Sequence, residues 1–374
     1  MRFADIPGHE AVKARLRQMV DSGRIPHALL LEGPAGIGKY ALARAFAQYI
    51  HCTDRTSDGD SCGRCPSCLQ HRAFNHIDAL YSFPLLKKNS KPTVSDDYAR
   101  EFHVFLDTHT FMDFDEWLAA MGNPNGQPMI YVEEATELLR RLNLTAHNSE
   151  YKTVIMWLPE RLRPEAANKL LKLVEEPHRD TIFIMTSDNP RGILGTIYSR
   201  TQRIAVPRYE PEEIVGYLTA GRGATSEAAR AAADIADGSM LAALRLLGAD
   251  RERAAHFELF KELMRLAWMR KIIDLRAWSR RVADLGREGS VNFYTYCSRM
   301  IRENFILNLH DPALVALTAE EQAFCARFSP FVNERNVVEM AAAVDSAIAD
   351  TRLNGNAKII AFDLAVQMIL LVKR

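Results

Sequence analysis

The fold of this protein is indicated most clearly by the segment His27-Ala28-Leu29-Leu30-Leu31-Glu32-Gly33-Pro34-Ala35-Gly36-Ile37-Gly38-Lys39. It opens with a short apolar run typical of a buried strand, continues as a glycine-rich turn, and leads into helix-forming residues. A loop in this setting can surround a phosphate with backbone N–H groups while a lysine reaches toward it. The pattern predicts a phosphate-binding loop at Gly33, Gly36, Gly38 and Lys39. The alternative is a turn that only packs the helix against the strand.

Two further apolar runs, residues 153–157 and 181–185, have the length and composition of buried strands. The helix-like segment 164–176 lies between them, and Pro177 ends it. Strands that alternate with helices predict an α/β fold with a parallel sheet covered on both faces.

The residue after the loop lysine departs from the usual phosphate-loop pattern. That position normally carries Ser or Thr, whose short hydroxyl coordinates Mg²⁺, and here it is Tyr40. A phenol oxygen lies several bonds further from the backbone and cannot replace that ligand. ATP with Mg²⁺ is therefore not an expected cofactor of this chain, and the loop alone leaves nucleotide binding open.

Four of the six cysteines lie close together in the sequence, at Cys52, Cys62, Cys65 and Cys68. Four thiolates at this spacing can close a tetrahedral Zn²⁺ site, and a site with four protein ligands is structural because no position remains for water. An iron–sulfur cluster and free thiols are the alternatives. Three histidines lie nearby, and we do not count them as ligands: His51, His71 and His76.

The 374 residues contain 47 Lys and Arg against 47 Asp and Glu, so the formal charge is zero. This balance provides no broad basic face for nucleic acid and excludes a highly charged disordered chain. The first residues contain no apolar signal segment, and the apolar stretch 359–372 is shorter than the roughly 20 residues that span a bilayer. We expect a cytoplasmic protein without membrane contact.

Two regions differ from the alternating pattern. Residues from about 83 to 127 read as an insertion, in which Phe111, Phe114 and Trp117 suggest a small local core. Its lysines suggest a solvated loop, with contact to DNA or a partner protein as the alternative: Lys87, Lys88 and Lys91. From Tyr209 onward strand patterns disappear and helical periods take over. The last part of the chain is therefore expected to be all-α.

Four motifs follow one another in the sequence. They are the loop, the four cysteines directly after its helix, the segment Ala167-Asn168-Lys169-Leu170-Leu171-Lys172-Leu173-Val174-Glu175-Glu176-Pro177, and Ser199-Arg200-Thr201. Together they resemble the bacterial DNA polymerase III clamp loader, within the AAA+ ATPase class. The resemblance implies an AAA+ P-loop domain at 1–208, with a zinc module at about 50–72 and the insertion at about 83–127. It implies a helical lid domain at 209–250 and an all-α collar domain for oligomerisation at 251–374.

Three positions that carry hydrolysis in the motor subunits of this family are altered here. The first is Tyr40. The second is the pair Trp157 and Leu158, which stands where motor subunits have Asp-Glu to bind Mg²⁺ and orient water. The third is Leu241, where a phosphate-contacting arginine is expected and Arg245 is the nearest basic residue. Glu160 could be read as a displaced base, although it lies two residues beyond the expected position.

The resemblance implies a role for Arg200 in trans, because the matching arginine in this family stabilises charge on the γ-phosphate held by a neighbouring subunit. A surface salt-bridge arginine is the alternative. The leading hypothesis is a non-hydrolysing loader subunit in DNA replication, with the motor and delta subunits, the sliding clamp and primed DNA as partners through the assembled complex. Two other hypotheses are an active motor subunit of the gamma/tau kind and a free-standing nucleotide- or DNA-binding module.

Overall fold

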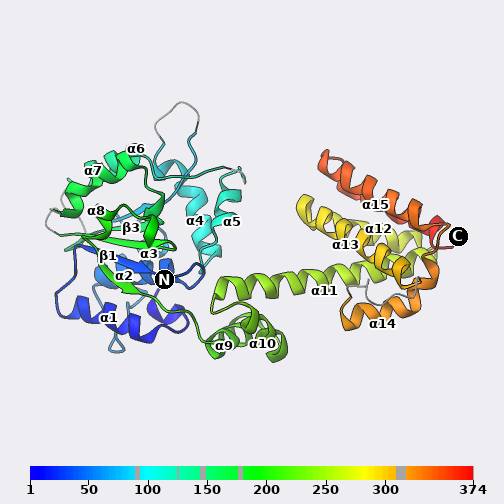
Figure 1. Ribbon diagram of the computed structural model, residues 1–374, viewed down its shortest axis with the longest axis horizontal. Coiled ribbons are helices and arrows are strands. Elements are labelled where there is room, and N and C mark those ends of the chain that lie inside the picture. Colours follow the sequence, from blue (N-terminus) through cyan, green and yellow to red (C-terminus); the bar gives the residue numbers. More distant parts are fainter. Residues whose placement is uncertain (89–92, 124–125, 144–148, 176–179, 309–316, 374) are drawn as a thin grey trace. The chain divides into compact units, whose positions relative to one another are not determined.

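The computed structural model describes residues 1–88, 93–123, 126–143, 149–175, 180–308 and 317–373. The chain divides into two compact units, Met1–Leu247 and Gly248–Arg374. Helix α11 (Met240–Trp268) contains the boundary between them (Figure 1). None of the helices in the described parts of the chain combines the length and the apolar composition of a membrane span.

The first unit is built on a five-stranded parallel sheet with the strand order β2-β3-β4-β1-β5. The strands are β1 (Ala28–Glu32), β2 (Ala79–Ser82), β3 (Lys152–Trp157), β4 (Thr181–Ser187) and β5 (Gln202–Ala205). The strands predicted at 153–157 and 181–185 correspond to β3 and β4. The four-residue strands β2 and β5 have no long apolar run and were not predicted.

Helices cover both faces of this sheet. Successive side chains of a strand point to opposite faces, and here the side chains on both faces are apolar and buried. Leu29 and Leu31 of β1 belong to the core on one face, and Ala28 and Leu30 to the core on the other. The first core contains α1 (Glu10–Asp21) and α2 (Lys39–His51), and the second contains α6 (Val132–Leu142) and α7 (Pro164–Glu175). The α/β fold with a parallel P-loop sheet is confirmed. Residues 176 and 177, predicted to end α7, lie outside the described residues.

The remaining elements of the first unit are short helices. They are η1 (Phe3–Asp5), α3 (Pro66–Arg72), η2 (Ser95–Tyr98), α4 (Ala99–Thr108), α5 (Phe114–Ala120), η3 (Pro159–Arg161), η4 (Pro190–Gly192), α8 (Gly195–Tyr198), α9 (Pro211–Arg222) and α10 (Ser226–Ile235).

The described part of the insertion joins the main core of the first unit. Phe111 and Trp117 are buried in the core that also contains Tyr40 and Trp157, with Phe114 packed against it. The expectation of a small local core was therefore wrong, because the core that holds these rings continues into the helices and strands of the sheet domain. Two lysines of the insertion contact aromatic rings: Lys87 Nζ lies 4.8 Å from the centre of the Tyr131 ring, and Lys88 Nζ lies 3.9 Å from that of Tyr98. Lys91 lies outside the described residues.

The second unit is all-α, as expected. After α11 it contains α12 (Ile272–Ala283), α13 (Gly286–Leu307), α14 (Ala319–Phe328), η6 (Ser329–Phe331), α15 (Val337–Arg352) and α16 (Ala357–Leu371) around one apolar core. Helices α9 and α10 and the start of α11 instead pack with the core of the first unit. The separate lid at 209–250 and the boundary at 250 stay predictions.

Candidate functional site

The glycine-rich loop connects β1 to α2 and is in contact with the first turn of α11. Gly36 has a φ of +78°, and a Cβ atom there would lie 2.3 Å from Ser239 Oγ and 2.7 Å from Leu241 Cβ. The Leu241 N–H donates to Gly36 O at 3.1 Å, and Ser239 Oγ donates to Ala35 O at 3.2 Å. Glycine is required at position 36 because the chain's own helix start approaches the backbone so closely.

Lys39, the predicted phosphate ligand, is paired within the chain. Its side chain is only 4% exposed, and Nζ lies 2.7 Å from Asp188 Oδ1 and also donates to Pro34 O. Burial lowers the pKa of Lys39, while the charge of Asp188 opposes that shift. A buried ammonium that already has a carboxylate partner needs no phosphate for charge compensation.

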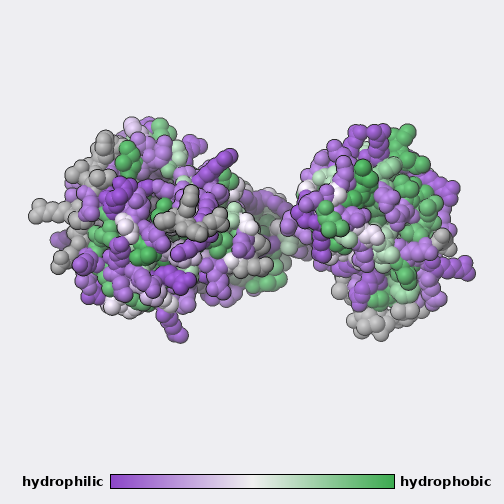
Figure 2. All heavy atoms as spheres, turned by 90° about the horizontal axis from the view of Figure 1, so that it is seen from above, coloured by the Kyte–Doolittle hydropathy of each residue, from purple (hydrophilic) through white to green (hydrophobic). Residues whose placement is uncertain are grey.

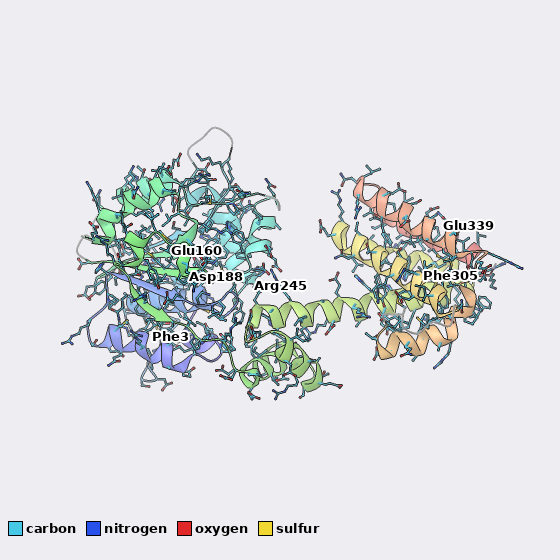
Figure 3. All side chains as sticks on the ribbon, in the orientation of Figure 1. Phe3, Glu160, Asp188, Arg245, Phe305 and Glu339 are labelled. Carbon is cyan, nitrogen blue, oxygen red and sulfur yellow. The ribbon has the colours of Figure 1, made fainter. Side chains whose placement is uncertain are left out.

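Glu160 positions the segment that carries Asp188, which directly follows β4. Glu160 Oε1 accepts the backbone N–H groups of Asp188 and Asn189, at 2.9 and 3.0 Å. Figure 3 labels the side chains of Glu160 and Asp188. Burial raises the pKa of Glu160. The hypothesis that Glu160 is a displaced base is not needed to explain this carboxylate, because its contacts are those of a structural residue.

The position of the Mg²⁺-binding hydroxyl is filled by an aromatic side chain. Tyr40 is buried, and its hydroxyl has no hydrogen-bond partner among the described residues. Its ring centre lies 6.1 Å from that of Phe102 and 6.2 Å from that of Trp157. Burial raises the pKa of the Tyr40 hydroxyl well above its usual value. With Trp157 and Leu158 in place of acidic ligands, these residues do not fit a Mg²⁺ ion.

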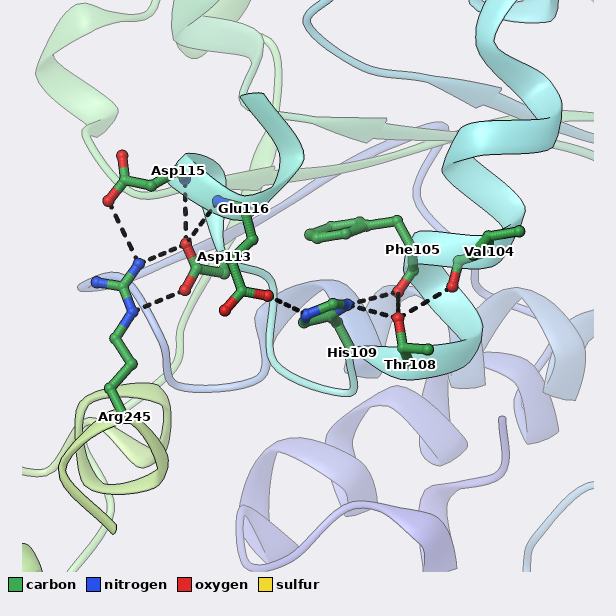
Figure 4. A network of polar contacts seen from close by, with 8 residues as sticks. All are labelled: Val104, Phe105, Thr108, His109, Asp113, Asp115, Glu116 and Arg245. Atoms are coloured by element: carbon green, nitrogen blue, oxygen red, sulfur yellow. Dashed lines mark hydrogen bonds and ion pairs between the residues drawn. The ribbon is translucent and has the colours of Figure 1, made fainter. Parts of the chain in front are cut away.

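Arg245, the nearest basic residue to Leu241, is held by an acidic residue of the insertion (Figure 4). Arg245 Nε donates to Asp113 Oδ2 at 2.7 Å, and Nη2 contacts the second oxygen. Asp113 is fully buried and also accepts the backbone N–H groups of Asp115 and Glu116 at the start of α5. The guanidinium therefore ties α11 to the insertion and is not free to contact a phosphate. Sequence patterns gave no sign of Asp113 or Asp188.

Arg200 lies at the surface just after α8. Its Nη2 lies 2.6 Å from Glu175 Oε1, and its Nη1 donates to Thr196 O at 2.9 Å. The side chain is 39% exposed and Glu175 is 42% exposed, so water screens this pair. Such an arginine can exchange its partner for a stronger anion at low cost.

The four cysteines converge as predicted. Their Sγ atoms all lie within 4.8 Å of one another, and those of Cys62 and Cys68 are 3.9 Å apart. Two thiolates bound to one tetrahedral Zn²⁺ lie about 3.8 Å apart, given Zn–S bonds of about 2.3 Å. Backbone N–H groups of Cys62, Cys65 and Cys68 point at cysteine sulfurs, at 3.2 to 3.4 Å. The arrangement fits one structural metal ion.

Three buried histidines, His51, His71 and His76, also meet beside this cluster. The rings of His51 and His76 are stacked, with centres 4.4 Å apart and planes 12° from parallel. In-plane lone pairs of stacked rings cannot point at one ion. His51 Nδ1 lies 2.8 Å from His71 Nε2, and Ser67 Oγ lies 3.0 Å from His76 Nε2. Burial lowers the pKa of His51 to about 3, so we interpret the group as a neutral hydrogen-bonded cluster.

The sheet and the glycine-rich loop between β1 and α2 define a P-loop protein of the AAA+ class. The family model described as "DNA polymerase III, delta subunit" matches residues 8–210, more than half of the 374-residue chain. The chain belongs to this family.

Curated relatives carry names of two kinds. The DNA polymerase III subunit delta prime of Haemophilus influenzae is 31% identical over 199 residues, which cover 52% of this chain and 48% of that protein. The delta prime subunit of Pseudomonas aeruginosa is 30% identical over 244 residues, covering 64% and 62%. The gamma/tau subunit of Mycobacterium tuberculosis is 30% identical over 210 residues, covering 55% and 29%. The match to the Haemophilus protein thus spans about half of its length.

Solved structures give a weaker likeness. A DNA polymerase III gamma subunit-related protein from Thermotoga maritima has a TM-score of 0.36 at 13% identity, covering 96% of this chain and 99% of that one. The Thermotoga maritima RuvB Holliday junction branch migration motor has a TM-score of 0.40 at 15% identity, covering 67% and 64%.

Proposed function

We propose that this chain is a non-hydrolysing subunit of a DNA polymerase III clamp loader. In that role it supplies Arg200 to the ATP site of a neighbouring motor subunit. The observation that carries the proposal is the state of the phosphate loop, where Lys39 is paired with Asp188 and Tyr40 lies in an apolar core. A chain with such a loop can act on ATP only through a partner's site.

The residues around the loop support the proposal that this chain does not hydrolyse ATP itself. ATP hydrolysis in this class needs a hydroxyl and a carboxylate on Mg²⁺ and a base that orients water. The corresponding positions hold Tyr40, Trp157 and Leu158, and Arg245 is bound to Asp113. Restoring any one of these groups would leave the others missing.

The environment of Arg200 supports its proposed role at a neighbouring subunit's ATP site. An arginine that acts in trans has to be exposed and only loosely held before the partner's phosphate arrives. Arg200 meets this requirement, because its one ion-pair partner among the described residues is the half-exposed Glu175. The partners would be the motor and delta subunits, with the sliding clamp and primed DNA engaged by the whole complex.

The proposal is tested by steady-state ATPase assays on the chain alone and on the chain mixed with its motor subunit and primed DNA. We expect no turnover by the chain alone and turnover in the mixture that falls with Arg200→Ala. Arg15→Ala is the matched control, since Arg15 is an exposed arginine on α1. Turnover by the chain alone that Lys39→Ala removes would instead identify it as a motor subunit.

A further inference from the structure

The second unit carries a small cavity that no part of the proposed function uses. The cavity has a volume of about 220 Å³ and lies between α11, α14 and the end of α16. We call it the aromatic socket. Its apolar walls are Met264, Trp268, Phe324, Phe328, Phe331 and Val372.

The aromatic walls of the socket contact one another. The Trp268 and Phe331 ring centres are 4.7 Å apart in an edge-to-face arrangement, and those of Phe324 and Phe328 are 5.2 Å apart and stacked. Apolar cavities of about 150 Å³ are known to bind benzene, so a space of this size takes one bulky apolar side chain.

Trp268, a wall residue of the socket, is followed along the chain by further exposed apolar residues. Trp268, Met269, Ile272 and Ile273 are 43, 45, 56 and 85% exposed, and they follow one another around the end of α11 and the start of α12. Hydrophobic side chains reach the surface of this unit in several places (Figure 2). Contiguous exposed apolar residues next to a cavity are typical of a protein-binding surface.

The rim of the socket is basic. Arg265 is exposed and makes no ion pair with any described residue. Lys373 Nζ lies 4.7 Å from the centre of the Trp268 ring. Lys261 also lines the cavity, with Glu258 as its partner at 2.5 Å. Positive charges around the apolar socket favour a ligand that carries negative charges next to an apolar side chain.

We propose that the aromatic socket is a docking site for an acidic protein segment with one bulky apolar side chain. The apolar side chain enters between Trp268 and Phe331, and neighbouring carboxylates meet Arg265 and Lys373. The socket and the basic rim together select such a segment over segments that lack either the apolar side chain or the carboxylates. This interaction is independent of the phosphate loop and of Arg200.

The test uses fluorescein-labelled synthetic peptides and the full chain, with binding followed by fluorescence anisotropy. The probe is Asp-Asp-Asp-Phe-Asp, and its matched controls are Asn-Asn-Asn-Phe-Asn, Asp-Asp-Asp-Ala-Asp and Lys-Lys-Lys-Phe-Lys. We expect the probe to bind about tenfold more tightly than any control, and more weakly as salt rises. No saturable binding of the probe up to about 1 mM, or equal binding of the Asn or Ala peptide, would overturn the proposal.

Two variants place the binding at the socket. Arg265→Gln keeps the walls and is expected to weaken the probe about fivefold, while Trp268→Ala is expected to abolish binding. Arg276→Gln is the matched control, because Arg276 is an exposed arginine on α12 that does not line the socket. Unchanged binding to Arg265→Gln and to a folded Trp268→Ala variant would contradict the proposal. So would tighter binding of single-stranded DNA that displaces the peptide.

Discussion

Lys39 Nζ lies 2.7 Å from Asp188 Oδ1, so the lysine of the phosphate loop has a carboxylate of its own chain as partner. The two residues come from the start of α2 and from the residue after β4, which are neighbours at one end of the parallel sheet. Parallel α/β sheets bind ligands at the carboxyl ends of their strands. Here the Lys39–Asp188 ion pair lies at that end of the sheet.

Removing Asp188 should therefore destabilise the fold. In Asp188→Ala, Lys39 stays buried without its charge partner, and we expect a loss of about 2 kcal/mol in the free energy of unfolding. Urea denaturation measures it, with Asp234→Ala on α10 as an exposed control. The variant Lys39→Met should lose less on top of Asp188→Ala than it loses alone, because the two residues form one pair. Additive losses would argue against the pair.

The tie between the insertion and α11 predicts a second stability effect. Asp113→Ala removes the partner of Arg245 and the cap of α5, and we expect a loss of about 3 kcal/mol. Asp115→Ala is the control, since the Asp115 side chain is 81% exposed and its contact with Arg245 is longer, at 3.3 Å. We expect that control to change stability by less than about 0.5 kcal/mol. Thermal denaturation measures both losses of stability. Equal losses for the two variants would contradict this interpretation.

Much of the first unit could be predicted because its signals are local. The strand, loop and helix around residues 27–44 follow from composition and glycine spacing, and the four cysteines follow from their number and spacing. For Tyr40, Trp157 and Leu158, the residue type alone shows that the side chain cannot bind Mg²⁺ or orient water. Asp113 and Arg245 could not, because residues 132 positions apart are brought together only by tertiary packing. The four-residue strands β2 and β5 were missed because pairing with neighbours defines them.

A buried carboxylate in the second unit predicts a pH effect. Burial raises the pKa of Glu321, but hydrogen bonds from Arg253, from the Thr318 N–H, from Tyr296 and from Arg299 outweigh it and lower the pKa to about 2. Its usual pKa is 4.5, so the folded state favours the carboxylate. The stabilisation is therefore present above pH 4.5 and is lost as pH falls from 4.5 to about 2.

The measurement is the free energy of unfolding of wild type and Glu321→Gln as a function of pH. We expect Glu321→Gln to be less stable by about 3 kcal/mol near pH 7, with a gap that narrows between pH 4.5 and pH 2. Glu320→Gln is the control, since Glu320 is its exposed neighbour on α14. A gap that stays constant over this pH range would show that the carboxylate charge is not the source of the effect.

The cysteine cluster predicts a metal-dependent fold near the amino terminus. Asp60 of this region accepts the N–H groups of Phe3 and Ala4, at 3.1 and 2.8 Å, so the cluster's loop also anchors the first residues. We expect elemental analysis to find about one zinc per chain and none in Cys65→Ser. A chelator should lower the melting temperature of wild type but not of Cys65→Ser, and added Zn²⁺ should restore it. Iron in place of zinc, or no metal in freshly purified protein, would contradict the assignment.

We propose that this chain has no working ATP site and contributes Arg200 to a partner's site. The most direct measurement is kcat for ATP hydrolysis by the motor subunit reconstituted with this chain and primed DNA, comparing wild type with Arg200→Ala at saturating ATP. We expect kcat to fall about 100-fold or more with assembly unchanged, because the arginine acts on charge that develops during phosphoryl transfer. An unchanged kcat in a fully assembled complex would rule out this role for Arg200.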